Sequence, residues 1–202
     1  KEMAKLAIQR LNASDMVACV DFGFLGGQVN QQIPFQVIGD NKPGLYALVD
    51  KMNPGDMPDF DPFLQYAADT LSDPKHNLTV KHCILISDGD PNFSNKAALQ
   101  KMTDNGITCT TIGVATHSAA EDNKMRLIAE STKDANGNPG NYHQPKTGKD
   151  LPAIYIKETR KISQSFIYDR EFRPELRLKG PPTDGLPQAL PGLYGFVRTT
   201  NK

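Results

Sequence analysis

The sequence predicts an α/β protein with a doubly wound, mostly parallel, Rossmann-like sheet and an antiparallel edge. Strand and helix patterns alternate from residue 80 onward, which is typical of parallel strands joined by helical crossovers. The apolar run over residues 83–86 stops at an acidic turn that contains Asp88, and ligands bind at such edges of open sheets. Two short strand patterns near the amino terminus, separated by a glycine- and glutamine-rich loop, predict the antiparallel edge.

The amino-terminal elements follow from the spacing of apolar residues. This spacing predicts a helix, the two strands of a hairpin and a brief helix over residues 3–11, 16–22, 33–38 and 44–52. A turn rich in acids and prolines follows, in which Asp61 is predicted to cap a helix over residues 63–71 with Pro62 at its first position. Asp59 and Asp61 are therefore predicted to lie near the amino-terminal end of a helix.

The second half of the chain continues the alternation. Strand, helix, strand, helix and helix are predicted over residues 80–87, 94–105, 107–114, 121–131 and 151–167. The strand over residues 107–114 is rich in β-branched residues and carries no charge, which predicts a central position in the sheet. Gly106 is a natural stop for the helix before it, and a short edge strand is expected around Tyr142.

The last part of the chain has a different composition. Residues 168–202 are rich in proline and charge and show no amphipathic period, so they are predicted to form a linker after a domain of residues 1–167. Residues 193–200 are predicted to form a lone strand without a partner in this chain. Because a strand needs a partner, it is expected to lead into a neighbouring module.

Composition excludes several classes of partner. Lysine and arginine (23) balance aspartate and glutamate (23), so no overall charge attracts nucleic acid or an anionic membrane. No apolar run approaches the roughly 20 residues of a membrane span, and the first residues resemble a helix rather than a signal peptide. A soluble segment without direct membrane contact is expected. The three cysteines lie in apolar strands and are interpreted as small core residues, without the spacing of a zinc site.

Asp88 and Asp90 allow three interpretations from the residues alone. They could contribute to a metal site, act as a phosphotransfer pair, or form a turn in which Asp90 caps the helix at Ser94. The phosphotransfer pattern of haloacid-dehalogenase-like enzymes expects Thr or Val two residues after the second acid, where this chain has Asn92. The turn is favoured for Asp90, and the metal site and the turn remain open for Asp88.

The order of four segments resembles a von Willebrand factor type A domain over residues 1–167. These segments are DMVACVDF, PFLQYAADTL, KHCILISDGDP and NGITCTTIGVATH. In that family an Asp-x-Ser-x-Ser loop after the first strand, a threonine from a second loop and an aspartate from a third form a metal-ion-dependent adhesion site (MIDAS). The resemblance implies a protein-binding domain that uses a divalent cation, Mg²⁺ or Mn²⁺.

The chain departs from the family pattern at several ligand positions. It begins in what should be the helix after the first strand, so that strand and its serine ligands are expected to be missing. Pro58 stands where the family has threonine, with Asp59 and Asp61 close by, and Asp88 alone matches its metal position. The predicted metal ligands are therefore Asp88, Asp59 and Asp61, and metal binding is expected to be weak or absent in this segment.

The carboxyl-terminal part is similar to a stretch of large bacterial membrane proteins of the glutamine amidotransferase-like class. The similarity lies in LPAIYIKETRKISQSFIYDREFRPEL and in GLPQALPGLYGFVRTTNK. It implies a membrane-anchored bacterial parent, on an unassigned side of the membrane, in which this domain adjoins an amidotransferase-like module. Glutamine hydrolysis requires a cysteine nucleophile on a tight turn, and none of the three cysteines is predicted there.

Together these observations predict a non-catalytic protein-binding or assembly module, with or without a divalent metal. One alternative is that the chain is part of a glutamine amidotransferase-type enzyme whose catalytic residues lie elsewhere. The other is a structural domain with a degenerate metal site, which Pro58 favours. No catalytic residue and no cofactor other than the metal is predicted, and the protein partner is not identified.

Overall fold

The computed structural model describes residues 1–22, 29–53, 55, 58–164, 167–168, 173, 180–181, 185, 192 and 196–197. The chain forms two compact units, Lys1–Ile162 and Ser163–Lys202. The first unit carries the α/β architecture and all of the predicted site residues.

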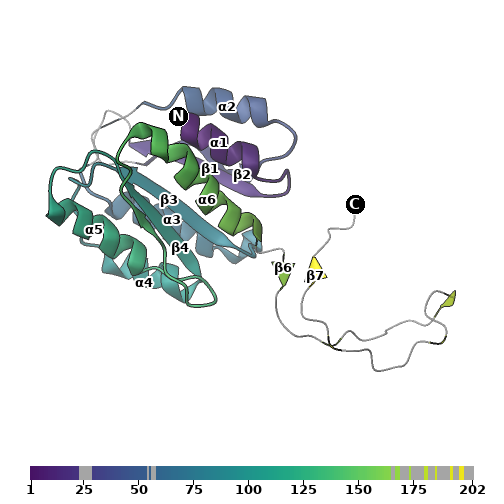
Figure 1. Cartoon of the computed structure of the whole chain (residues 1–202). Helices are drawn as coiled ribbons and strands as arrows, with labels where there is room; N and C mark the ends of the chain where they lie inside the picture. The colour runs from purple at the N-terminus through teal and green to yellow at the C-terminus, as the bar shows by residue number, and fades with distance from the viewer. Residues whose placement is uncertain are drawn as a thin grey trace. The chain divides into compact units, whose positions relative to one another are not determined.

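Helices and strands alternate along the first unit. They are α1 (Glu2–Arg10), β1 (Met16–Phe22), β2 (Val29–Val37), α2 (Lys42–Asp50), α3 (Asp61–Ser72), β3 (Lys81–Ser87), α4 (Lys96–Asp104), β4 (Ile107–Gly113), α5 (Ala119–Glu130), β5 (Tyr142–His143) and α6 (Leu151–Gln164), with 3₁₀ turns at Pro74–His76 and Gly148–Asp150. In Figure 1 the colour follows this order from purple to green. Gly106, with φ of +65°, ends α4 as the sequence predicts.

In the described part of the first unit, the strands form a three-stranded parallel sheet and a two-stranded antiparallel sheet. β4 lies between β3 and β5 and runs parallel to both. β1 and β2 pair antiparallel, with Met16 opposite Val37 and Phe22 opposite Val29. The α/β class, the antiparallel pairing of the first two strands, the central position of β4 and the short strand at Tyr142 are therefore confirmed, although among the described residues β1 and β2 form a sheet of their own.

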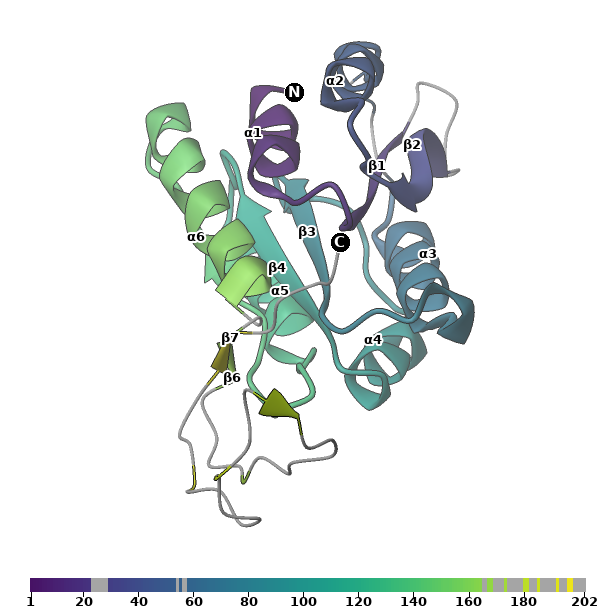
Figure 2. The same cartoon turned by 90° about the vertical axis from the view of Figure 1, so that its right-hand side faces the viewer.

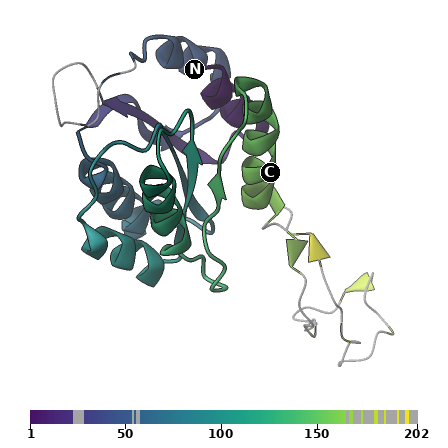
Figure 3. The ribbon, with the colours of Figure 1, turned by 60° about the vertical axis from the view of Figure 1, so that its left-hand side comes forward.

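Helices cover both faces of the parallel ladder. Figure 2 shows α6 and α1 over one face of β3 and β4, with α3 and α4 on the other, and Figure 3 shows the same layers from another side. The alternation of side chains along β4 matches this arrangement, because Thr110 reaches Glu158 of α6 whereas Thr111 donates to the Met125 carbonyl of α5. A strand covered on both faces excludes water, and β4 is almost entirely buried.

Apolar residues gather in two core clusters. The larger cluster joins α3, α4 and α5 to the strands, and its buried members include Leu64, Met102, Ile107 and Ile128. The smaller one packs α1 and α2 against the β1–β2 hairpin, around Ile8, Ile33, Leu45 and Val49. The larger cluster also contains Phe22 of β1, so both ladders contribute to it.

Four local predictions are wrong. Phe60 precedes α3 and Asp61 is the first helical residue, so Asp61 is not its cap. Asn95, rather than Asp90, caps α4 by accepting the Ala98 amide at 3.0 Å. In the second unit, β6 (Ile167–Tyr168) pairs antiparallel with β7 (Phe196–Val197). The helix predicted up to residue 167 therefore ends earlier, and the carboxyl-terminal strand has a partner within this chain.

Candidate functional site

The site is built on the carboxyl ends of β3 and β4. Ser87 and Gly113 are register partners at these ends, and the Val114 amide donates to the Ser87 carbonyl at 2.8 Å. Asp88 follows β3 directly and its side chain is exposed. The Ser87 hydroxyl donates to Asp88 Oδ1 at 3.2 Å and accepts the Gly89 amide at 3.1 Å. The chain therefore turns sharply at the point where it presents the Asp88 carboxylate to solvent.

Gly89 is required by the geometry of this turn. Its φ is +92°, which side chains with a Cβ rarely adopt. A Cβ built on Gly89 would lie 2.9 Å from Cβ of Glu121 in α5. The loop after β3 therefore packs directly against the first turn of α5.

Lys124 of α5 fixes the loop from its other side. Its Nζ donates to the carbonyl oxygens of Gly89, Asp90 and Pro91 at 3.1, 3.2 and 2.6 Å. Three carbonyls that converge on one ammonium give the loop a defined conformation. Sequence reasoning missed this contact, because a lysine in the second turn of an amphipathic helix carries no signal of its own.

The loop that contains Asp59 lies beside the loop that contains Asp88. Asp59 and Asn92 form a parallel β-bridge. The Phe60 amide donates to the Asn92 carbonyl at 2.8 Å, and the Asn92 amide donates to the Pro58 carbonyl at 3.1 Å. The bridge brings together two acidic segments that are about thirty residues apart in the chain.

Asp61 is engaged in structural hydrogen bonds. Its carboxylate accepts the amides of Ser94 and Asn95 at 3.0 and 2.9 Å and the Ser94 hydroxyl, and its own amide donates to Asp59 Oδ1 at 3.0 Å. Burial raises the pKa of Asp61, but the hydrogen bonds from Ser94 and Asn95 outweigh burial and the pKa is lowered overall. Asp61 therefore fixes the start of α4 relative to α3.

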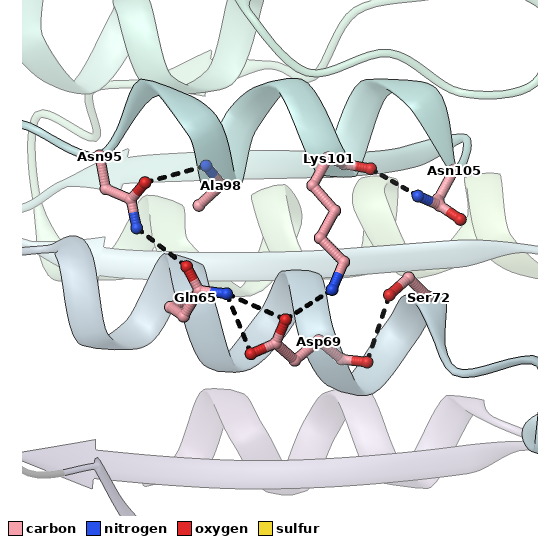
Figure 4. Close-up of polar contacts among 7 residues, drawn as sticks. All are labelled: Gln65, Asp69, Ser72, Asn95, Ala98, Lys101 and Asn105. Atoms are coloured by element: carbon pink, nitrogen blue, oxygen red, sulfur yellow. Dashed lines mark hydrogen bonds and ion pairs between the residues drawn. The ribbon is translucent and has the colours of Figure 1, made fainter.

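Polar contacts continue from this point along the α3–α4 interface. Figure 4 shows Asn95 joined to Gln65, and both Gln65 and Lys101 joined to Asp69. The Lys101 Nζ to Asp69 Oδ1 distance is 2.6 Å, and both side chains are about half exposed. These contacts align the two helices whose amino-terminal ends border the candidate site.

A second polar cluster borders the carboxyl end of β4. The Tyr142 hydroxyl donates to Asp122 Oδ1 at 2.5 Å, and Gln144 Nε2 donates to both Asp122 and Thr116. Burial and the Asp122 carboxylate raise the pKa of Tyr142 well above its usual value, so the phenol stays protonated. The guanidinium of Arg126 lies 4.8 Å from the centre of the Tyr142 ring. This cluster connects α5 to β5 and contains a single carboxylate.

The oxygen atoms near Asp88 are of the type that a hard cation binds, but they are too few to complete its coordination. Carboxylate and hydroxyl oxygens are ligands that Mg²⁺ and Mn²⁺ accept. Ser87 and Asp88 carry such oxygens at the end of β3, and Asp59 lies in the bridged loop, where its Oδ1 already accepts the Asp61 amide at 3.0 Å. Over the described ranges, however, no three His, Cys, Asp or Glu side chains come together as they would around a metal ion. A cation here would need further ligands from water or from another segment.

These features define a parallel α/β domain with an acidic loop at the carboxyl edge of its sheet. The profile of the von Willebrand factor type A domain matches residues 1–155, and the chain belongs to this family. A comparison with curated protein sequences found no match.

Solved structures share this fold. An aerotolerance-related membrane protein from Bacteroides fragilis matches with a TM-score of 0.54 and 16% identity, over 79% of this chain and 88% of that one. The protein BatB from Bacteroides thetaiotaomicron matches with a TM-score of 0.54 and 13% identity, over 81% and 86%. Proximal thread matrix protein 1 from mussel byssus, solved with a zinc-occupied MIDAS motif, matches with a TM-score of 0.57 and 14% identity, over 80% and 41%. At these identities the likeness concerns the fold.

No helix in the described part of the chain combines the length and the apolar character that crossing a membrane requires.

Proposed function

We propose that this domain is a non-catalytic protein-binding or assembly module whose binding face is the loop edge around Asp88. The observation that carries the proposal is the bridge between Asp59 and Asn92, which joins the two acidic loops next to an exposed Asp88. Ligands bind at this edge in open α/β sheets. The loop is held by Lys124 and by close contact with α5, so its carboxylate is presented on a rigid support.

A divalent cation, Mg²⁺ or Mn²⁺, is proposed as the link between this edge and an acidic side chain of the partner. Asp88 and Asp59 are its proposed ligands. Asp61 is a weaker candidate, because Ser94 and Asn95 already occupy its carboxylate oxygens. With so few protein ligands the affinity is expected to be low.

Two strands of the first unit each have an edge that could pair with a further strand. Among the described residues β1 pairs with β2 alone and β3 with β4 alone, so each has one backbone edge without a ladder partner. Phe22 of β1 and Leu85 of β3 nevertheless belong to one core cluster. We infer that a strand from outside the described residues lies between β1 and β3, completes the domain and supplies further metal ligands.

We also propose that the domain belongs to a membrane-anchored bacterial protein with an amidotransferase-like module. The support is the similarity of the carboxyl-terminal stretch and the fold shared with a membrane protein from Bacteroides fragilis. If that parent is an amidotransferase, its nucleophile must lie outside this chain, because Cys19, Cys83 and Cys109 all lie within strands.

A second candidate function is a structural domain whose metal site is degenerate. Pro58, which has no hydroxyl, and the hydrogen bonds that occupy Asp61 favour this alternative. Its partners would then bind through surface contacts that do not depend on a cation.

Calorimetric titration with Mg²⁺ and Mn²⁺ separates the two candidates. We expect weak binding to the wild-type chain that is lost in Asp88→Asn and reduced in Asp59→Asn. Asp90→Asn is the matched control, since it removes an exposed acid from the same loop and should leave binding unchanged. Wild-type binding that survives Asp88→Asn would contradict the proposed site, and no binding to the wild type would favour the structural domain.

Partner binding is tested by capture on immobilised protein in the presence of Mn²⁺. A specific partner should be released by EDTA and should not be retained by Asp88→Asn. A partner that is retained in the presence of EDTA and also by Asp88→Asn would support the metal-independent alternative.

A further inference from the structure

Two cysteines face each other across the parallel ladder. Cys83 of β3 and Cys109 of β4 are direct register partners. Residues opposite one another in neighbouring strands project from the same face of the sheet, and here this is the face of the larger core cluster. Cys109 is a buried member of that cluster and Cys83 packs against it. Both thiols are free.

The spacing of the strands permits a bond between the two sulfurs. Neighbouring strands are about 4.8 Å apart, which lies within the roughly 4.4–6.8 Å range of Cα separations in disulfides. The Cβ atoms of such a pair are expected to remain farther apart than the approximately 3.8 Å that a relaxed disulfide prefers. A disulfide at this position would therefore be strained, and strained disulfides are readily reduced.

The two thiols differ in their surroundings. Cys109 is 0% exposed, whereas Cys83 is half-buried because β3 has one open edge among the described residues. The hydrogen bond to Cys83 and burial both raise the pKa of the Cys109 thiol. Cys109 therefore keeps its proton, and Cys83, the more exposed of the two sulfurs, is the one that an oxidant reaches first.

Cys19 provides an internal comparison. It lies in β1 with its thiol 3.3 Å from the sulfur of Met52, in the other core cluster. Burial raises the pKa of Cys19 to about 11, which disfavours the reactive thiolate. Cys19 has no register partner that is a cysteine.

We propose that Cys83 and Cys109 form a reversible oxidation site that takes a peroxide as its oxidant. The Cys83 thiolate attacks one oxygen of hydrogen peroxide, the O–O bond breaks, and a sulfenic acid and, after proton transfer, water are formed. The Cys109 sulfur then attacks the Cys83 sulfur, the S–O bond breaks, and the second water leaves with the proton of Cys109. Two thiols lose two electrons and two protons, and the peroxide is reduced to two waters.

The disulfide would link β3 covalently to β4, on the amino-terminal side of the loop that carries Asp88. The inference rests on strand register and does not require the proposed metal site. A further strand beside β3 would cover Cys83, so the site would respond to peroxide while that edge of β3 is open.

The test uses the wild-type chain, because trypsin places each cysteine in a separate peptide. Cleavage after lysine and arginine, except before proline, gives fragments 11–51, 82–96 and 102–124, which contain Cys19, Cys83 and Cys109. After treatment with hydrogen peroxide and alkylation of free thiols, we expect fragments 82–96 and 102–124 to be linked. Two of the three thiols should be lost, Cys19 should be alkylated, and dithiothreitol should restore both thiols.

Matched variants complete the test. Cys19→Ser should form the same link, whereas Cys83→Ser should leave Cys109 as a free thiol at the same peroxide dose. The proposal is overturned if Cys83 and Cys109 both stay alkylated, if the link joins two chains or involves Cys19, or if Cys83 proceeds to sulfinic acid without pairing.

Discussion

Replacement of Glu158 by alanine should destabilise the domain strongly. Glu158 is 0% exposed, although it carries a carboxylate. It accepts the Thr110 hydroxyl at 2.8 Å, Asn141 Nδ2 at 3.0 Å and contacts His143 Nε2 at 2.9 Å. These partners come from β4, the segment before β5, and β5 itself. Glu158 therefore joins α6 to the parallel ladder through buried polar contacts.

The expected loss of unfolding free energy follows from the hydrogen-bond partners that lose their acceptor in Glu158→Ala. A buried polar group left without its partner costs about 1–3 kcal/mol. Glu158→Ala would leave three such groups without their acceptor, on Thr110, Asn141 and His143. Because the three contacts share one carboxylate and are not independent, we expect a loss of about 3–5 kcal/mol in the free energy of unfolding for Glu158→Ala. Glu158→Gln keeps the size and one acceptor oxygen, and should lose about 1–3 kcal/mol.

Urea unfolding at neutral pH, followed by far-ultraviolet circular dichroism, measures these losses. The thermal midpoint of Glu158→Ala should fall by about 6–20 °C, since each kcal/mol corresponds to about 2–4 °C in a domain of this size. Glu130→Ala is the matched control, because the Glu130 to Arg126 contact is 4.0 Å long and more than half exposed, and should cost under about 1 kcal/mol. A Glu158→Ala loss no larger than that of the control would refute the reasoning.

Three further predictions concern the loops and helices around the candidate site. Gly89→Ala should lose about 1–3 kcal/mol of unfolding free energy in urea titrations, because φ is +92° and the new Cβ meets α5; an unchanged value would contradict the required turn. Asp61 has a lowered pKa in the folded domain, so its stabilising contribution is present above the unfolded pKa of about 3.9 and is lost as pH falls through the folded pKa. The stability difference between wild type and Asp61→Asn should therefore shrink below about pH 4, and a difference that grows with acidity would reverse the assigned sign. Lys101→Ala should cost under about 1 kcal/mol and less at 1 M salt, since its ion pair with Asp69 is half exposed; a large, salt-independent loss would show that the contact is not a surface pair.

Local patterns in the sequence predicted most elements of the first unit. The period of apolar residues distinguishes helices from strands, and glycine marks where a helix ends, because both depend on residues within a few positions of one another. Gly106 and the β-branched run of β4 are examples, and both appear in the structure as predicted. The central place of β4 could also be predicted, because a continuous run rich in β-branched residues is typical of a strand that is covered on both faces.

The roles of single polar residues could not be predicted in this way. Asp61 resembles a helix cap because a proline follows it, yet its carboxylate binds Ser94 and Asn95, which are 33 and 34 residues away. The Asp59 to Asn92 bridge and the Lys124 contacts with the loop after β3 likewise join separate segments. The residues next to an aspartate in the sequence do not show whether its carboxylate caps its own helix or accepts hydrogen bonds from the start of the following helix.

The sequence by itself determined the class of the protein, the order of its elements and the position of Asp88 at the end of a buried strand. The tertiary structure decided that Asp88 is exposed whereas Asp61 is engaged by Ser94 and Asn95, which strand edges lack a partner among the described residues, and that Cys83 lies opposite Cys109. The physical reason is that periodicity and turn chemistry act over a few residues. Hydrogen bonds, burial and strand register between distant segments exist only once the chain has packed.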